Sequence, residues 1–436
     1  MTKLNFMLIA IILVFILGYA AIVFEHTIKI NKTASALVTG VLCWTIYALN
    51  GSDFQVIETE LIHHFAEAAQ ILFFLLGAMT IVELIDAHEG FDVIVEVIKT
   101  KKKSKFIWII GFIAFFLSAI LDNLTTTIVM VSFIRKFIAD REDRLFVASI
   151  IIIAANAGGA WTPIGDVTTT MLWIGGQVTT FALVEHLLLP SLVCLIVPLF
   201  YVSFKMKGTF EAPNKEQDDP SVSASKFPVS EQHKRIVFFL GIASLIFVPI
   251  FKTFTHLPPF MGMLLSLGVM WIVVEILHSE KDDEDKNVLT PLGALRKIDT
   301  PSILFFAGIL LAVGTLSATG ILKSAAEGLT HIFGNFNLIA IVIGLLSAIV
   351  DNVPLVAASM GMYSLEQFPQ DHAFWHFLAY CAGTGGSILI IGSAAGVAAM
   401  GMEKIEFFWY MKRIAFIAAL GYFAGCLVFI VEHFIF

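Results

Sequence analysis

Residues 118–127 read SAILDNLTTT and place one carboxylate, that of Asp122, between the apolar runs 106–117 and 128–138. Burying an ionised carboxylate in a hydrocarbon layer is costly, so an acid in such a segment indicates a functional site. The pattern returns 229 positions later, where residues 347–354 read SAIVDNVP around Asp351. The sequence therefore predicts two such sites, one in each half of the chain.

The composition is typical of a polytopic membrane protein. Of 436 residues, 58% are hydrophobic and 14% are charged. No soluble core of this size needs so many apolar residues. The net charge of −8 comes mostly from loops, and the lack of a long basic face excludes nucleic acid as a partner. Apolar runs predict two re-entrant hairpins and ten crossings, at residues 5–24, 34–49, 69–86, 145–178, 183–204, 235–252, 259–278, 301–318, 373–400 and 413–435.

Lysines and arginines predict the orientation, because positively charged short loops tend to stay in the cytoplasm. Five lysines between residues 99 and 105 precede the first aspartate motif, and four basic residues between 135 and 144 follow it. Both flanks are therefore expected on the cytoplasmic side, so the segment should enter the membrane, turn at Asp122 and return. Lys29 and Lys32 follow the first apolar run and are assigned to the cytoplasmic side as well.

The second aspartate motif has no Lys or Arg in its flanks, residues 330–335 and 366–372, so this hairpin should enter from the outside. Two copies of opposite orientation form an inverted-topology repeat, which can open a central site to each side in turn. The segment ILFF also occurs twice, at 71–74 and 303–306. The predicted fold class is an all-α polytopic membrane protein with two inverted-topology repeats, each containing a re-entrant hairpin and an interrupted transmembrane helix.

The repeats define three predicted regions. Residues 1–204 form an N-terminal transmembrane repeat, with a hairpin around 106–140 and a broken helix at 145–178. Residues 205–234 are polar and rich in Pro and Ser, and are expected to form a cytoplasmic linker. Residues 235–436 form the C-terminal inverted repeat, with a hairpin around 336–366 and a broken helix at 373–400. Two segments of mixed polarity, 51–66 and 88–100, are expected to form helices in the membrane interface.

Each hairpin is followed by an apolar segment that small and polar residues interrupt. The first reads AANAGGAWTPIGDVTTT at 154–170, where Pro163 lacks a backbone donor and three glycines loosen the helix. Unwound backbone inside a bilayer is tolerated where it lines a cavity. Asp166 lies beside this break. The second copy, CAGTGGSILIIGS at 381–393, has Ser393 where the first has Asp166.

The polar side chains of the hairpins and broken helices are all oxygen ligands, which suit a hard cation. Burial favours the protonated form of a carboxyl group and a bound cation favours its ionised form, so protons and cation compete for the same oxygens. Each aspartate also has a structural interpretation, because it could cap a helix end. The candidate cation- and proton-binding residues are Asp122, Asn123, Thr125, Asn156, Thr162, Asp166, Asp351, Asn352 and Ser393.

Residues 121–127, LDNLTTT, and 156–169, NAGGAWTPIGDVTT, resemble the NhaD-type sodium/proton antiporters of the ion transporter superfamily. The resemblance runs over nearly the whole chain. It implies exchange of Na⁺, with Li⁺ as a further cation, for protons across a bacterial inner membrane, with Na⁺ at Asp122, Asp166 and Asp351. It also implies a homodimer in the lipid bilayer, without enzymatic activity or a cofactor.

Two alternatives stay open. An anion, dicarboxylate or arsenite transporter of the same superfamily would need a cationic or hydroxyl-rich substrate pocket, yet neither broken helix contains Arg or Lys. An intramembrane aspartyl protease also needs two embedded aspartates, one of them in a Gly-x-Gly-Asp signature. Here the residue two positions before Gly165 is Pro163, and Asp122 does not follow a tyrosine.

Overall fold

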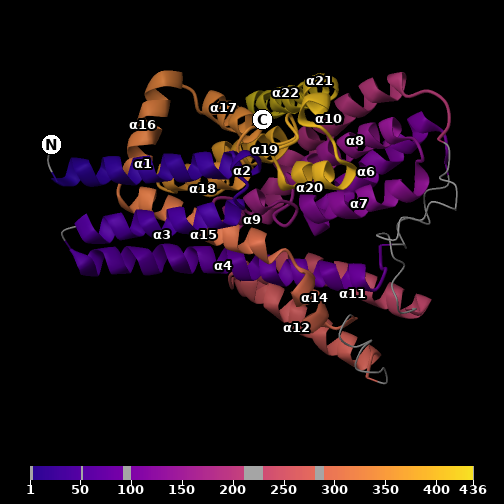
Figure 1. The fold of residues 1–436 in the computed structure, drawn as a ribbon, viewed down its shortest axis with the longest axis horizontal. Coiled ribbons are helices and arrows are strands. Elements are labelled where there is room, and N and C mark those ends of the chain that lie inside the picture. Colours follow the sequence, from indigo (N-terminus) through magenta and orange to yellow (C-terminus); the bar gives the residue numbers. More distant parts are fainter. Residues whose placement is uncertain (1–2, 51–52, 92–99, 211–228, 280–288, 436) are drawn as a thin grey trace.

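The computed structural model describes residues 3–50, 53–91, 100–210, 229–279 and 289–435. The regular secondary structure of this part of the chain is helical (Figure 1), apart from one isolated bridge between Lys102 and Thr209. The all-α prediction is therefore confirmed for the described residues. In the first half of the chain the helices are α1 (Lys3–Val23), α2 (Glu25–Ile28), α3 (Lys32–Asn50), α4 (Phe54–Ala87), α6 (Lys103–Leu121), α7 (Asn123–Phe137), α8 (Arg141–Gly159), α9 (Val167–Ile174) and α10 (Thr180–Lys205).

The second half follows a similar order of long helices, a hairpin and a broken helix. Its helices are α11 (Glu231–Thr255), α12 (Pro259–Leu277), α14 (Pro291–Lys297), α15 (Thr300–Ala318), α16 (Ile321–Phe333), α17 (Phe336–Ser347), α18 (Asn352–Met362), α19 (Ala373–Gly385), α20 (Ala394–Glu403), α21 (Phe407–Arg413) and α22 (Ala415–Ile435).

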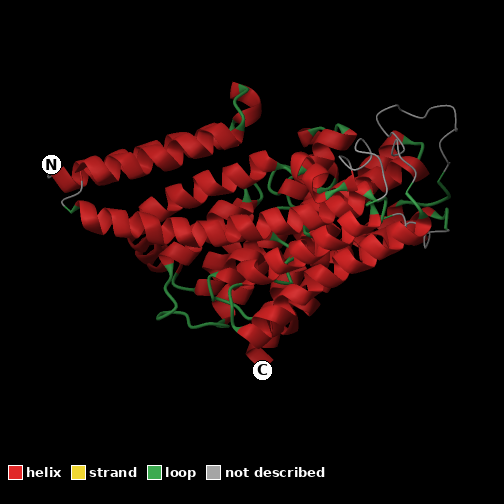
Figure 2. Cartoon of the chain, turned by 90° about the horizontal axis from the view of Figure 1, so that it is seen from below, coloured by secondary structure: helices red, strands yellow, loops and turns green. Residues whose placement is uncertain are grey.

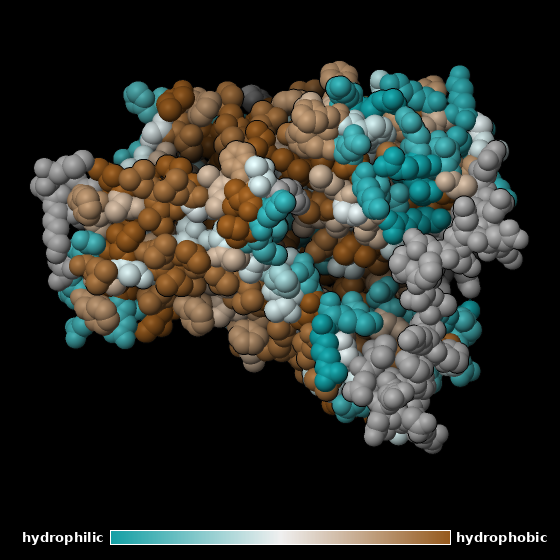
Figure 3. All heavy atoms as spheres, viewed as in Figure 1, coloured by the Kyte–Doolittle hydropathy of each residue, from teal (hydrophilic) through white to brown (hydrophobic). Residues whose placement is uncertain are grey.

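Nine of the described helices are long and apolar enough to cross a membrane, and the pair α16 and α17, bent by 112°, is a tenth candidate. Figure 3 shows the corresponding surface, where apolar side chains cover the left and middle of the molecule and hydrophilic ones gather at its right-hand end. The multi-pass prediction is confirmed, but the set of candidate spans differs from the expected one, because it includes α6, predicted as half of a hairpin. The two interrupted segments divide into shorter helices, as predicted.

One predicted boundary is wrong. The mixed polarity of residues 51–66 predicts an interfacial segment, but Phe54–Ala87 forms one continuous helix of 34 residues. Asp53 starts it by accepting hydrogen bonds from the backbone N–H groups of Gln55 and Val56, and no glycine or proline follows until Gly77. The other expected interfacial helix, 88–100, falls largely on residues 92–99, which lie outside the described part of the chain.

The first hairpin returns to the end of the molecule from which it enters. Its arms are α6 and α7, with Asp122 between them. At its base, Lys103 Nζ lies 2.5 Å from Asp143 Oδ2, so the start of α6 lies against the start of α8, just after α7 has ended. The Lys103 N–H also donates to the Gly208 carbonyl (3.0 Å), immediately beyond the end of α10.

The second hairpin, α17 and α18, closes in the same way at its own base. The ring of Phe336, the first residue of α17, lies 6.1 Å from that of Tyr363 and 4.7 Å from that of Phe368, both beyond the end of α18. A few residues further on, Asp371 accepts hydrogen bonds from the N–H (2.6 Å) and hydroxyl (2.8 Å) of Thr179, which precedes α10.

Helix α10 relates the two hairpins. It has 26 residues, which corresponds to a length of about 39 Å. The base of the first hairpin lies at its C-terminal end and the base of the second near its N-terminal end. The hairpins therefore enter from opposite ends, and their tips approach each other in the middle of the molecule.

Equivalent contacts recur in the two halves. The Ser118 hydroxyl donates to the Ala155 carbonyl (2.6 Å), and the Ser347 hydroxyl donates to the Ala382 carbonyl (2.8 Å). These bonds tie the end of each hairpin's first arm to the broken helix that follows. Glycines at the same crossings leave no room for a side chain: a Cβ on Gly158 would lie 2.1 Å from the Phe115 carbonyl oxygen.

A second group of helices flanks the hairpins. Helices α3 and α15 cross closely, because a Cβ on Gly40 would lie 2.6 Å from the Gly308 carbonyl oxygen. Thr33 also donates to the Pro301 carbonyl (2.9 Å) and fixes the start of α3 against the start of α15. Helix α1 packs on α3 at the periphery of the molecule, as Figure 2 shows for the N-terminal helix. We call α3, α4, α11, α12 and α15 the flanking helices.

Candidate functional site

Four helices begin at candidate site residues, and these N-termini gather where the hairpin tips meet the broken helices. An N-terminus is the positive end of a helix and favours a carboxylate beside it. Each of the four side chains accepts a hydrogen bond from a backbone N–H of its own helix: Asp122 from Thr125 (2.8 Å), Asp166 from Thr168 (2.8 Å), Asp351 from Val353 (3.3 Å) and Ser393 from Gly396 (3.1 Å). The three aspartates therefore do cap helices, whatever else they do.

Asp122 forms the tip of the first hairpin in a restricted backbone conformation. Its φ is +86° and its ψ is 160°, a combination outside the left-handed helical region that almost only glycine adopts. Oδ1 accepts from the Thr125 N–H and Oδ2 from the Thr125 hydroxyl (2.9 Å). The predicted pair Asp122 and Thr125 is thus one local unit, which orients the carboxylate.

Asp166 lies between the tips of the two hairpins. It is 2% exposed, and its Oδ1 accepts from both the N–H and the hydroxyl of Thr168. Its Oδ2 accepts from Asn123 Nδ2 at 2.6 Å, and Asn352 Nδ2 lies 3.4 Å from the same oxygen. The asparagines of both Asp-Asn pairs therefore reach the carboxylate of the first broken helix.

Asn156 connects the two halves from a fully buried position. Its Oδ1 accepts from Asn123 Nδ2 (2.9 Å). Its Nδ2 donates to the hydroxyls of Ser387 (2.8 Å) and Ser393 (2.9 Å), both on the second broken segment. Ser387 is missing from the predicted residues, because the glycines of this segment dominate its pattern. The signal for it is a buried hydroxyl next to Gly386, inside an interrupted apolar helix.

Thr162 has a more local position than predicted. Its hydroxyl donates to the carbonyl of Ala119, in the last turn of α6, at 2.7 Å. The side chain therefore joins the broken segment to the first hairpin, and its hydroxyl hydrogen is committed to that bond.

Asp351, at the tip of the second hairpin, has an unexpected neighbour. Lys32 Nζ lies 3.5 Å from Asp351 Oδ2 and 4.6 Å from the centre of the Phe305 ring. The side chains of Lys32 and Asp351, together with Asp122, line a cavity of about 60 Å³ between the hairpin tips and the flanking helices. The sequence assigns Lys32 to a loop on the cytoplasmic side, whereas the structure brings it to the site.

The three aspartates surround this region without forming one compact cluster. Among the described residues, no group of three or more His, Cys, Asp or Glu side chains is close enough to hold a metal ion. The oxygens available to a cation therefore come mainly from different chemical groups, namely carboxylates, amides, hydroxyls and backbone carbonyls.

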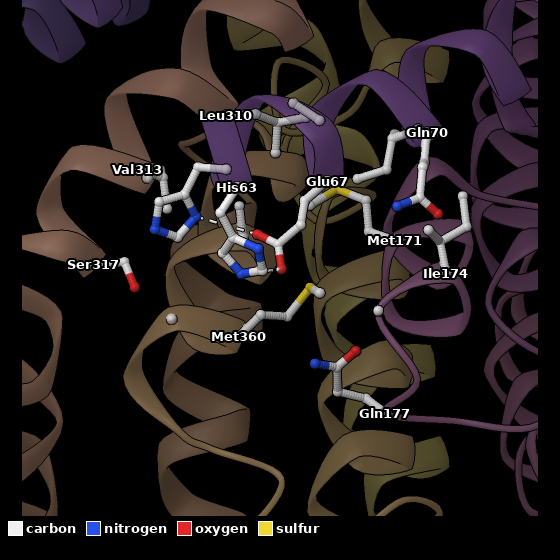
Figure 4. A pocket seen from close by; sticks show the side chains of 17 residues that line it. His63, Glu67, Gln70, Met171, Ile174, Gln177, Leu310, Val313, Ser317 and Met360 are labelled. Carbon is white, nitrogen blue, oxygen red and sulfur yellow. Dashed lines mark hydrogen bonds and ion pairs between the residues drawn. The ribbon is translucent and has the colours of Figure 1, made fainter. Parts of the chain in front are cut away.

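A larger cavity of about 440 Å³ lies on the next turns of α4, α9, α15 and α18 (Figure 4). Figure 4 shows His63, Glu67 and Gln70 of α4 on one side and Met360 and Gln177 on another. The Glu67 carboxylate lies 3.4 Å from His63 Nε2 and 3.1 Å from His64 Nδ1. The cavity is therefore lined by polar side chains. The same four helices also line the smaller cavity at Asp122 and Asp351.

Opposed hairpins, broken helices and three aspartates at their junction, of which Asp166 is buried, define a multi-pass membrane transporter. The sequence matches the model of a family described as "Citrate transporter" over residues 19–375. It is 50% identical over 425 residues to "Sodium/proton antiporter 1" of Arabidopsis thaliana, covering 98% of this chain and 72% of the relative. It is 32% identical over 449 residues to "Na(+)/H(+) antiporter NhaD" of Vibrio cholerae, covering 95% of this chain and 89% of the relative.

The chain belongs to the family of NhaD-type sodium/proton antiporters, within the wider group that the citrate transporter model describes. The predicted resemblance is confirmed, and these relatives are transporters, not enzymes. The relatives come from plants as well as bacteria, and those from Arabidopsis thaliana share more of the sequence, at 50% and 47% identity. Membership therefore establishes a multi-pass membrane protein without fixing a bacterial source.

Proposed function

We propose that the protein exchanges Na⁺ for H⁺ across a membrane by alternating access, with cation and protons competing for buried carboxylates. The observation that carries the proposal is the junction of the two hairpins, where Asp122 and Asp351 line one small cavity and Asp166 binds the asparagines of both tips. Relatives named as sodium/proton antiporters support the same activity.

The carboxylates argue for a cation over an anion. Helix N-termini are ready-made anion sites, so four of them at one junction would suit a carboxylate substrate. Here three are already occupied by the protein's own aspartates. The carboxylates of these three aspartates need positive charge to balance them, and Na⁺, Li⁺ or protons can supply it.

We propose that the cation binds in the cavity between Asp122 and Asp351, with Asn123 and Thr125 beside it. A carboxylate offers about four acceptor positions. Asp166 uses most of its positions on Thr168, Asn123 and Asn352, whereas Asp122 accepts from the first turn of its own helix, at Thr125. In this proposal Asp166, Asn156, Asn352 and Ser393 hold the hairpin tips in register, and Thr162 anchors the first tip.

Alternating access is supported by the opposed entry of the hairpins at the two ends of α10. The cavity shown in Figure 4 is the proposed route from one side, since it lies on the same four helices as the site. The hydrophilic right-hand end in Figure 3, which includes the base of the first hairpin, is the proposed cytoplasmic end. The division into residues 1–204, 205–234 and 235–436 belongs to the same proposal.

The decisive experiment uses everted vesicles from a host that lacks its own sodium/proton antiporters. Respiration acidifies the lumen, a trapped pH dye is quenched, and NaCl, LiCl or KCl is added. Exchange predicts recovery of the dye on adding Na⁺ or Li⁺. Absence of recovery with every cation, in vesicles shown to contain the protein, would refute antiport.

An organic anion is the second candidate substrate, namely citrate or a dicarboxylate, because the family model carries the description "Citrate transporter". Uptake of labelled citrate by the same vesicles, without cation-dependent dye recovery, would favour it over antiport. We propose the bacterial inner membrane as the location of the protein because several relatives are bacterial. The higher identity to the plant relatives favours a plant membrane as the alternative location. The homodimer is also a proposal, and cross-linking in native membranes tests it.

A further inference from the structure

The feature that the function described above leaves unused is the ammonium group of Lys32. It lies 3.5 Å from Asp351 Oδ2 and lines the same cavity as Asp122 and Asp351. Charged side chains inside a membrane protein are costly, so they pair with one another and mark ion pathways. If Lys32 and Asp351 formed a permanent structural ion pair, their charged atoms would lie at hydrogen-bonding distance and both side chains would be well buried.

The observed geometry is that of a loose pair. Strong charge-assisted hydrogen bonds between an ammonium and a carboxylate measure about 2.7–2.9 Å, whereas this pair is separated by 3.5 Å. The side chains are 27% exposed for Lys32 and 17% exposed for Asp351, so the contact borders open space. The Phe305 ring offers the ammonium a second favourable position, at 4.6 Å from its centre.

The two partners also belong to different parts of the molecule. Lys32 starts α3, which the Thr33 bond to the Pro301 carbonyl and the close Gly40–Gly308 crossing fix to α15. Asp351 starts α18 at the tip of the second hairpin. The pair therefore joins a flanking helix to a hairpin tip.

Resting on the proposed function, we propose that the Lys32 ammonium is a tethered cation: it occupies the Asp351 carboxylate when no transported cation is bound, and Na⁺ displaces it. The tethered cation compensates the negative charge of Asp351 in the empty site and competes with Na⁺ for one oxygen of its carboxylate. Lys32 is thus a positioning residue that sets the apparent affinity for Na⁺. The described contacts give Asp122, at the equivalent position in the first half, a threonine in place of an ammonium.

The test is the Na⁺ concentration for half-maximal dye recovery in everted vesicles, measured for Lys32→Gln, Lys32→Arg and a control. The control is Lys29→Gln, which changes an exposed lysine three positions earlier. Removing the competing charge should lower the half-saturating Na⁺ concentration of Lys32→Gln about three- to tenfold. Lys32→Arg keeps the charge and should stay near the wild-type value, as should Lys29→Gln.

Binding of ²²Na⁺ to purified protein provides a second measurement, independent of turnover. Where Lys32→Gln fails to accumulate, Lys32→Met keeps the apolar stem over Phe305 and should show the same gain in Na⁺ affinity. An unchanged or weaker affinity in the active, folded variant would overturn the tethered cation and leave the antiport proposal intact. Absence of Na⁺-dependent recovery and binding in the wild-type protein would refute both proposals.

Discussion

Replacing Asp122 by asparagine separates the charge of this side chain from its role as a helix cap. Asparagine has the same side-chain shape as aspartate, so it meets the same backbone constraint at φ +86°, and it caps helices about as well as aspartate does. Its Oδ1 can still accept from the Thr125 N–H, and its Nδ2 can donate to the Thr125 hydroxyl, which then acts as acceptor. The contacts of the hairpin tip are therefore kept, so Asp122→Asn should fold and insert like the wild type.

The loss of charge should nevertheless abolish exchange. Two unit charges 4 Å apart interact by about 4 kcal/mol at an effective dielectric constant of about 20. Losing that interaction weakens cation binding by about three orders of magnitude, since each 1.4 kcal/mol is about a factor of ten. No accessible Na⁺ concentration would then saturate the site.

Dye recovery in everted vesicles, titrated with NaCl, measures this effect. Asp53→Asn is the matched control, because Asp53 also caps a helix but is exposed and lies at the start of α4. Wild-type protein levels with no recovery are expected for Asp122→Asn, and full recovery for the control. Exchange by Asp122→Asn with the wild-type half-saturating concentration would show that Asp122 is a cap and nothing more.

Three further outcomes follow from the structure. Gly158→Ala should reduce the folded fraction in size-exclusion chromatography, because its Cβ would lie 2.1 Å from the Phe115 carbonyl oxygen. Glu403→Gln should lower the free energy of unfolding by about 1–3 kcal/mol in a melting experiment. It weakens contacts of 2.6 Å to Arg135 and 3.2 Å to Arg144 around a carboxylate that is 3% exposed. For each pH unit by which the pH is lowered, the half-saturating Na⁺ concentration should rise by up to about tenfold, because a protonated carboxyl group no longer binds a cation.

Each of these outcomes has a clear opposite. Gly268→Ala is the control for Gly158→Ala, because nothing lies within 4 Å of the position that its Cβ would take. An equal loss of folded protein from both changes would show that the close crossing at Gly158 does not require glycine. An unaltered melting temperature for Glu403→Gln would show that the ion pairs of α20 do not hold the two halves together. A half-saturating Na⁺ concentration independent of pH would exclude competition between cation and proton.

Several features of the fold follow from the sequence directly. The repeated Asp-Asn pair within SAI-x-DN predicts two hairpin tips, since a group of polar residues inside an apolar segment indicates either a turn of the chain or polar partners for these side chains. The glycines and Pro163 predict the unwound segment, which the structure has between Gly159 and Val167. Basic residues predict that the first hairpin returns to its own side, in agreement with the contact between Lys103 and Asp143.

Other features needed contacts between distant segments. The length of α4 does not follow from its sequence, because the polar residues before Gln70 indicate an interfacial segment, whereas several of them line the cavity of Figure 4. Ser387 escapes prediction because its partner, Asn156, lies 231 positions away, in the other half of the chain.

The sequence by itself determined the class of protein and the carboxylates at its centre, because burying charge in an apolar segment is so costly that each such residue stands out. The tertiary structure alone decided which groups surround them. Lys32 reads as an ordinary loop lysine, and it meets Asp351, 319 positions away, because the close packing of α3 on α15 carries its ammonium to the tip of the second hairpin. Local composition sets the energetic cost of a buried charge, but only the packing of distant helices determines how that charge is balanced.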